Sequence, residues 1–207
     1  SKDSGSEDAI AYVIQSGLGL PDEAYYREEA HAETLSAYEK HVAEMLEFLD
    51  PARLFGLGAE VAAHRIVSLE KELAAGHWDV VSTRDAVKTY NPCEFSELPT
   101  MTRALLSGGN LPEHRVVNMM PSYLEHFESL FTTARMADWQ LWATWHILRS
   151  RAAMLPEEVG AKNFEFYGTK LSGATQQRDR WKRAVGLAES LVGEEIGQVF
   201  VEKHLPA

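Results

Sequence analysis

Apolar residues recur every three or four positions along most of this 207-residue chain, and this spacing constrains its fold more than any other feature. Side chains at such intervals share one face of an α-helix. The pattern therefore predicts a mainly α, multi-helix domain. The clearest stripes are Leu35, Tyr38, Val42, Met45 and Leu49, then Ala62, Ile66, Leu69 and Leu73, and later Trp139, Leu141, Trp142, Trp145 and Leu148. Further helices are expected near residues 121–130, 156–166, 181–191 and 196–200.

The first of these helices has a recognisable start. Pro21 suits the first position of a helix, because its missing N–H would lack a helical partner there in any case. Asp22 and Glu23 follow in the first turn, where acidic side chains favour the positive end of the helix dipole. The first apolar stripe then continues the same helix. We expect one long helix that begins at Pro21 and ends before Pro51.

Two short segments favour β-strands. Residues 9–15 are apolar and rich in β-branched side chains, and Gly17 and Gly19 stop the run, although a helix is an alternative at this length. Val116 and Val117 mark a second short segment. We expect one or two short strands near residues 9–15 and 115–119, which could pair with each other.

The charge balance limits the classes of partner. The formal net charge is -11 at pH 7, which argues against nucleic acid or an anionic membrane as a partner, because phosphate binding needs a basic face. No run approaches the roughly 18 to 20 apolar residues that span a bilayer. We expect neither a nucleic-acid partner nor a membrane span.

Cys93 is the only cysteine, so no disulfide can form within the chain. A lone cysteine favours a reducing compartment, and a cytoplasmic location is expected, with secretion left open. Residues 1–8 are polar and acidic, unlike a signal peptide. We expect them to form a flexible lead-in or to mark a cut inside a longer protein.

Two carboxylate–imidazole pairs could suggest a metal site. Glu28 and His31 have the Glu-x-x-His spacing of carboxylate-bridged di-iron bundles, but those sites need two such units and two further glutamates. Glu60 and His64 occupy adjacent helical positions that cannot close a zinc site by themselves. We expect both pairs on solvated helix faces, and the sequence assigns no metal ligand.

Other candidate chemistry is equally weak. Cys93 precedes Glu94, and a neighbouring carboxylate raises a thiol pKa, which disfavours a nucleophilic role. Gly17-x-Gly19 lacks the third glycine of a dinucleotide fingerprint. The tryptophans within 139–145 could line a ligand pocket, but tryptophan at helical spacing is more often core. The sequence thus assigns no catalytic and no cofactor-binding residue.

Six strings, in one order across nearly the whole chain, resemble the zinc endopeptidase family of neprilysin, endothelin-converting enzyme and their bacterial relatives. They are Gly17-Leu18-Gly19-Leu20-Pro21 with Tyr25-Tyr26, Leu69–Ala74, Arg84-Asp85 with Tyr90-Asn91, Val116-Val117 with Pro121 and Tyr123-Leu124, Phe164, Tyr167, Leu171 and Gly173 with Arg180-Trp181, and Gly193, Gly197 and Phe200-Val201. One family signature is missing: none of the eight histidines begins a His-Glu-x-x-His.

The resemblance implies a two-lobed, mostly helical parent enzyme that binds zinc in one lobe and closes a second lobe over it. It places residues 9–207 in the second lobe, which encloses a chamber for oligopeptides, and it places the zinc outside this chain. No catalytic or zinc-ligand position of the family maps onto a residue here. The partners implied are the zinc lobe of the same polypeptide and oligopeptide substrates, and the lone Cys93 points to the soluble bacterial type. The alternative is a stand-alone helical interaction domain without peptidase activity.

Overall fold

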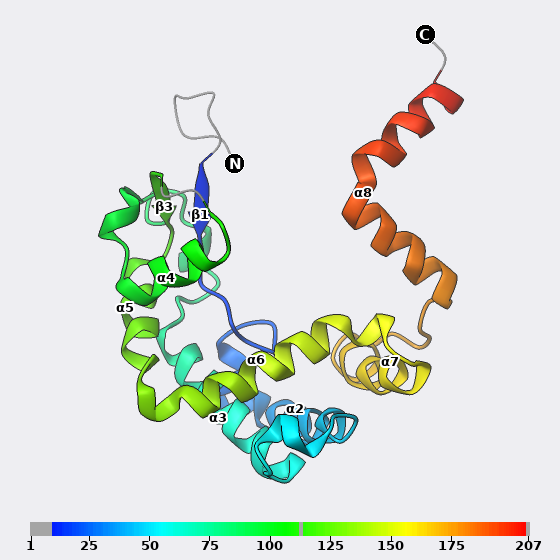
Figure 1. The fold of residues 1–207 in the computed structure, drawn as a ribbon, viewed down its shortest axis with the longest axis horizontal. Coiled ribbons are helices and arrows are strands. Elements are labelled where there is room, and N and C mark those ends of the chain that lie inside the picture. Colours follow the sequence, from blue (N-terminus) through cyan, green and yellow to red (C-terminus); the bar gives the residue numbers. More distant parts are fainter. Residues whose placement is uncertain (1–9, 112–113, 206–207) are drawn as a thin grey trace. The chain divides into compact units, whose positions relative to one another are not determined.

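The computed structural model describes residues 10–111 and 114–205 (Figure 1). The expected lead-in at residues 1–8 lies outside this part. Within the described residues the chain is mainly α, as the apolar spacing predicts. The helices are α1 (Ala24–Arg27), α2 (Ala32–Leu46), α3 (Ala59–Gly76), α4 (Thr100–Gly108), α5 (Pro121–Leu130), α6 (Met136–Arg151), α7 (Glu157–Phe164) and α8 (Arg180–His204). The strands are β1 (Ala11–Val13), β2 (Pro92–Cys93) and β3 (Val116–Asn118).

The chain divides into two compact units, residues 1–146 and 147–207, with the boundary inside α6. The first unit contains the sheet and α1 to α5, and the second contains α7 and α8. None of the described helices combines the length and the apolar character that a membrane span requires.

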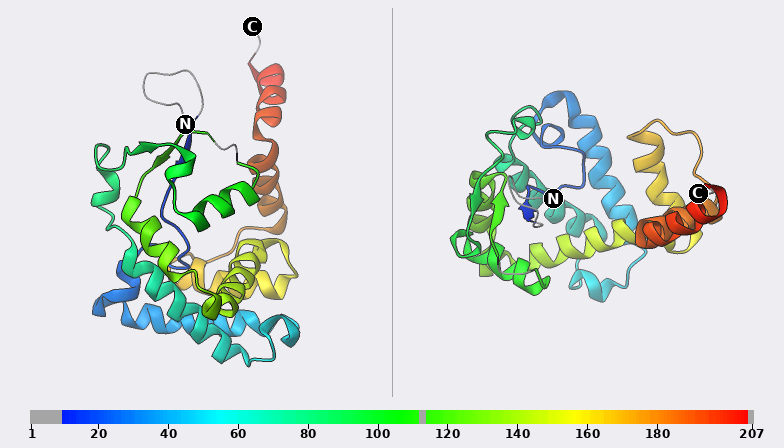
Figure 2. Two further views of the ribbon diagram at one scale, coloured as in Figure 1. Left: turned by 60° about the vertical axis from the view of Figure 1, so that its left-hand side comes forward. Right: turned by 90° about the horizontal axis from the view of Figure 1, so that it is seen from above.

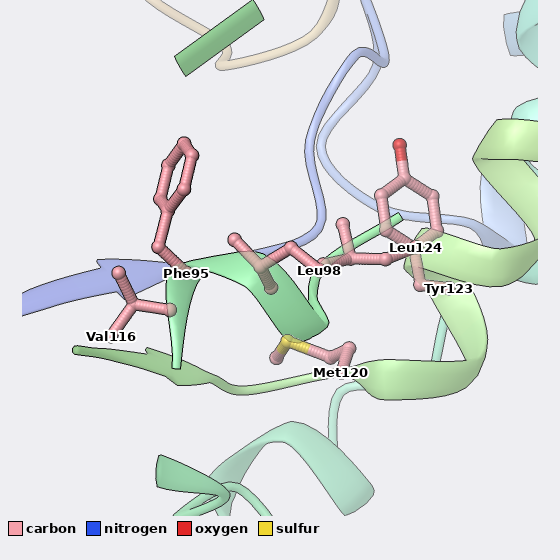
Figure 3. Packing of buried hydrophobic residues seen from close by; sticks show 6 residues of the cluster. All are labelled: Phe95, Leu98, Val116, Met120, Tyr123 and Leu124. Carbon is pink, nitrogen blue, oxygen red and sulfur yellow. The ribbon is translucent and has the colours of Figure 1, made fainter. Parts of the chain in front are cut away.

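The two predicted strands pair with each other in a small sheet of order β1-β3-β2. β1 runs parallel to β3, with Ala11 opposite Val116 and Val13 opposite Asn118. The two-residue strand β2, which was not predicted, pairs antiparallel with β3. Side chains from the sheet, η4 (Phe95–Glu97), the residues after it and α5 pack together beside the sheet (Figure 3). They are Phe95, Leu98, Val116, Met120, Tyr123 and Leu124.

The prediction of a single long helix that begins at Pro21 is wrong. α1 ends at Arg27, the next residue, Glu28, has an extended backbone (φ -88°, ψ 131°), and the short helix η1 (Glu29–His31) precedes α2. The physical reason is that Tyr26 and Tyr38 both bond to one carboxylate, that of Glu70. In a continuous helix these residues, twelve positions apart, would lie about 18 Å apart along the axis. The break lets both hydroxyls reach the same point.

The apolar stripes of α2 and α3 face each other and form much of the core of the first unit. The two helices run side by side (Figure 2). Their buried apolar residues are Tyr38, Val42, Met45 and Leu46 from α2 and Ala62, Ile66, Leu69 and Leu73 from α3. The predicted stripes are thereby confirmed, although Leu49 lies beyond the end of α2 and is half-buried.

The tryptophans of α6 mostly belong to the core, as expected. Trp145 is fully buried and Trp139 nearly so, whereas Trp142 is half-buried. Trp139 stacks on Phe131, with ring centroids 4.5 Å apart, and lies edge-on to Trp142. Aromatic pairs in these two geometries add stability beyond their buried area.

The second unit has its own short-range packing. Arg183 of α8 donates a 3.0 Å hydrogen bond to the carbonyl oxygen of Ala153, before α7. α8 is interrupted by a kink at Val192 (φ -136°, ψ 36°), between the two helices expected near 181–191 and 196–200. No residue of α8 is buried, although Trp181 and Leu191 are large and apolar.

Candidate functional site

The most distinctive polar cluster surrounds Glu70 of α3, whose side chain is 0% exposed. Tyr26 donates a hydrogen bond to Glu70 Oε2 at 2.6 Å, and Tyr38 donates to Oε1 at 3.1 Å. His146 Nε2 of α6 lies 2.8 Å from the same Oε1. A buried carboxylate is unfavourable unless it is paired and hydrogen-bonded, and these three groups meet that need.

The protonation of Tyr26 follows from its surroundings. Burial, and after it the negative charge of Glu70, raises the pKa of the Tyr26 phenol. The phenol therefore keeps its proton and donates a hydrogen bond to the carboxylate. The same oxygen accepts hydrogen bonds from the backbone N–H groups of Gly19 and Leu20, each at 3.0 Å. Tyr26 thus links the loop before α1 to α3.

The loop at residues 16–20 is held at further points. The carbonyl oxygen of Ser16 accepts a 2.6 Å hydrogen bond from the Tyr123 hydroxyl, and that of Gly17 accepts one of 2.9 Å from the Trp142 indole. Gly17 has φ +101°, a conformation that glycine tolerates best. A Cβ on Gly19 would overlap the hydroxyl of Tyr38. Both glycines are therefore needed for the path of this loop.

Residues from two of the strings that carry the family resemblance meet here: Gly19 and Tyr26 from the first, and Glu70 from the second. The indole of Trp145 adds a 2.8 Å hydrogen bond to the Tyr38 hydroxyl. Each Glu70 oxygen already accepts at least one hydrogen bond, and the carboxylate is sealed from water. The cluster links the loop to α1, α2, α3 and α6, and it buries the carboxylate completely, although the His146 side chain is 19% exposed.

Glu70 was not singled out from the sequence, although a signal was present. It lies four positions after Ile66 and three before Leu73, on the apolar face of a helix. A charged residue at such a position must be paired when it is buried. Its partners are 44, 32 and 76 positions away, beyond the reach of any local pattern.

A cavity of about 300 Å³ lies beside the loop. Among the described residues that line it, Asp22 and Glu23 are the only ones of aspartate, glutamate, lysine or arginine type. Glu23 is buried, and its Oε1 accepts a 2.8 Å hydrogen bond from Arg27, but its Oε2 has no partner among the described residues. His77 also lines the cavity. Burial lowers the pKa of His77 and therefore favours the neutral form of its imidazole.

The sequence-derived metal candidates are not brought together. Glu28 is exposed on extended backbone, not on a helix face, and His31 stacks on the ring of Tyr25. His64 pairs at 2.9 Å with Glu39 of α2 and not with Glu60. Within the described residues, no three His, Cys, Asp or Glu side chains are grouped in a way that could hold a metal ion.

Cys93 lies in β2 and is half-buried. Burial, and after it the carboxylate of Glu97, raises the pKa of its thiol. The direction agrees with the expectation from the sequence, but the larger cause is burial, and Glu97 raises the pKa more than Glu94 does. A thiol with a raised pKa is a poor nucleophile at neutral pH.

Comparison with known proteins gives a consistent result. A family model described as "Peptidase family M13" (Peptidase_M13_N) matches residues 1–207. The crystal structure of Mycobacterium tuberculosis zinc metalloprotease ZMP1 with an inhibitor is 41% identical, covering 98% of this chain and 32% of that chain, with a TM-score of 0.84. ZMP1 in its open state is 42% identical, covering 93% of this chain and 31% of that chain, with a TM-score of 0.80.

A curated relative is Neprilysin-2 of Drosophila melanogaster, 28% identical over 216 residues. The match covers 92% of this chain but 27% of that protein. The chain therefore spans about a third or less of the length of the proteins that it matches.

Proposed function

Because the chain belongs to peptidase family M13, we propose that it is the helical, non-catalytic lobe of a zinc metalloendopeptidase whose zinc is bound by another lobe of the same polypeptide. Membership confirms the family resemblance drawn from the sequence. The observation that carries the proposal is the match over residues 1–207, supported by the TM-score of 0.84 with a zinc metalloprotease.

The proposal assigns this chain a positional role. Residues 9–207 would form one wall of a chamber that admits flexible oligopeptides and keeps folded proteins out. The described residues offer no group of His, Cys, Asp and Glu that fits a zinc ion, so no step of hydrolysis is assigned to them. The buried cluster around Glu70 supports the role, because a wall that orients a substrate must keep its shape.

Binding between this lobe and the zinc lobe, and oligopeptides as substrates, are parts of the same proposal. A cytoplasmic location is a further part, supported by the lone Cys93. The structures of ZMP1 with an inhibitor and in an open state support the idea that lobe closure accompanies turnover in this family.

The first experiment compares this chain with the complete polypeptide that carries it. We expect the complete polypeptide to contain a His-Glu-x-x-His motif, to bind zinc stoichiometrically by elemental analysis, and to cleave a quenched fluorogenic oligopeptide. The 207-residue chain alone should neither bind zinc stoichiometrically nor cleave the peptide. Chelator-sensitive cleavage by the chain alone would contradict the proposal.

A second experiment tests the restriction of access. One cleavable sequence is presented to the complete enzyme as a free decapeptide and within a surface loop of a stable folded domain. We expect cleavage of the free peptide only. The control is a protease whose active site lies in an open cleft, which should cleave both forms. Equal kcat/KM values for the two forms with the complete enzyme would argue against a size-selective chamber.

The alternative function is a stand-alone helical interaction domain. The observation that favours it is the row of exposed apolar residues on α8, where Trp181 is 64% and Leu191 73% exposed. Exposed apolar patches often mark interaction surfaces. A complete polypeptide without His-Glu-x-x-His and without peptidase activity would support this alternative.

A further inference from the structure

One edge of the small sheet has no partner strand in the described part of the chain. The strand order is β1-β3-β2, so β1 is an edge strand. The backbone N–H of Met119 donates a 3.0 Å hydrogen bond to the carbonyl oxygen of Val13, which shows that Val13 faces β3. In a parallel ladder, alternate residues face opposite edges. The backbone N–H and C=O groups of Tyr12 and Ile14 therefore face the open edge.

Apart from its length of three residues, this edge lacks the features that usually protect an edge strand. Natural sheets block their edges with charged side chains, prolines or bulges. Residues 11–15 contain neither a charge nor a proline, and the side chain of Ile14 is 56% exposed. Ala11 and Val13 pack against the cluster in Figure 3, so Tyr12 and Ile14 occupy the other face of the strand. The edge is a template for another extended backbone.

The segment that follows β1 leads to an acidic cavity. Gln15 and Ser16 come directly after this edge and line the cavity of about 300 Å³ that also contains Asp22 and Glu23. The buried Glu23 carboxylate has one oxygen without a partner among the described residues. Asp22 and Glu23 together make this wall acidic, so a ligand of positive charge gains affinity there. The ligand chemistry that complements this wall is an ammonium or a guanidinium group.

We propose that the open edge of β1 binds an extended peptide by strand addition, with a basic side chain or amino terminus of that peptide in the acidic cavity. Main-chain hydrogen bonds to Tyr12 and Ile14 supply sequence-independent affinity, and the cavity supplies a preference for one cationic group. This inference rests on the proposed function, because it gives the peptide substrate a place on this lobe.

The test uses the 207-residue chain and a capped heptapeptide of alternating threonine and valine with one central lysine. A second heptapeptide carries norleucine in place of lysine. Binding is followed at 150 mM salt by amide NMR shifts and by calorimetry. We expect the lysine peptide to shift and protect the Tyr12 and Ile14 amides, and to bind about tenfold more tightly than the norleucine peptide.

Two variants separate the parts of the site. Tyr12→Pro removes a donor that faces the open edge and leaves the hydrogen bonds to β3 in place, so binding of both peptides should fall about tenfold or more. Tyr12→Phe is the matched control and should bind as the parent chain does. Glu23→Gln should abolish the preference for lysine and leave binding of the norleucine peptide unchanged.

A second test changes the peptide and leaves the protein unaltered, so it remains valid even if the Tyr12→Pro variant does not fold. N-methylation of alternate amides on one edge of the peptide should abolish binding, whereas the same change on its other edge should not.

Unchanged binding by a folded Tyr12→Pro variant, or shifts confined to α8, would overturn the proposal. Peptide-independent dimers with protected β1 amides would overturn it in favour of self-pairing. Equal affinity for lysine and norleucine would overturn the assignment of the cavity. Because no turnover is measured, failure here is distinguishable from failure of the zinc and cleavage tests.

Discussion

The phenol oxygen of Tyr26 lies 2.6 Å from Oε2 of Glu70 and also accepts hydrogen bonds from the backbone N–H groups of Gly19 and Leu20. One hydroxyl therefore joins a loop, a four-residue helix and the buried face of α3. Each of these groups is buried, so each depends on the others for its hydrogen bonds. The relationship is structural and not catalytic, and stability measurements can test it.

Replacing Tyr26 with phenylalanine should destabilise the chain by about 3 kcal/mol. The change removes one donor to the Glu70 carboxylate and the acceptor for two buried N–H groups, while the ring volume is kept. Urea unfolding followed by circular dichroism gives the free energy of unfolding. The control is Tyr12→Phe, for which we expect a change within about 0.5 kcal/mol. Equal values for the two variants would contradict the role of the cluster.

Replacing Gly19 with alanine should destabilise the first unit by about 3 kcal/mol, because the new Cβ would overlap the hydroxyl of Tyr38. Relief of the overlap would displace Tyr38 from Glu70 and Trp145. Gly108→Ala is the matched control, since a Cβ there meets nothing within 4 Å. A thermal midpoint of the Gly19→Ala variant that matches the control would show that the loop can move aside.

The tryptophans of α6 should differ in their contributions. Trp145 is 0% exposed and donates to Tyr38, so Trp145→Ala should cost about 3 to 5 kcal/mol. Trp142 is half-buried, and its replacement by alanine should cost about 1 to 2 kcal/mol. Denaturant midpoints for both variants measure this order. A larger loss for Trp142→Ala would indicate that its hydrogen bond to Gly17 outweighs the burial of Trp145.

Stability should fall on acidification through a window set by His77. Burial lowers the pKa of His77 below 6.5, whereas in the unfolded chain it keeps its ordinary value. Between the two values the unfolded chain binds more protons, so this contribution is complete above about pH 6.5 and is lost as the pH falls. Urea unfolding at pH 7.5 and 5.5 should show a smaller pH-dependent loss for His77→Gln than for the parent chain. Identical losses would contradict the assignment.

Alkylation of Cys93 should be slow in the folded chain. Burial and the carboxylate of Glu97 raise the pKa of its thiol, so little thiolate is present at pH 7.5. Iodoacetamide labelling followed by mass spectrometry should proceed more slowly than in urea. Glu97→Gln should accelerate labelling modestly, because it removes the larger of the two carboxylate effects that raise this pKa. Faster labelling in the folded chain than in urea would be inconsistent with this environment.

The parts of the fold that follow local rules were predictable from the sequence. Tyr38, Val42 and Met45 are buried together because their spacing matches one face of a helix. The strands at Ala11–Val13 and Val116–Asn118 lie within the segments expected for them, and they pair with each other. Local periodicity thus specified the main elements.

The parts that depend on distant contacts were not predictable in this way. The break at Glu28 exists because Tyr26 and Tyr38 meet at a carboxylate 44 and 32 positions further along the chain. β2 is two residues long and has no periodicity to detect. The acidic cavity is formed by residues near 15–23 and 77–83, which no sequence pattern connects.

The hydrogen bonds from Tyr123 to Ser16 and from Trp142 to Gly17 join residues 107 and 125 positions apart. During synthesis on the ribosome, the amino-terminal loop emerges long before α6 exists. The loop therefore cannot complete these hydrogen bonds, and Glu70 lacks its imidazole partner His146, until α6 leaves the exit tunnel. A translational pause shortly before Met136 would prolong this immature state, and chaperone capture is most expected in that interval.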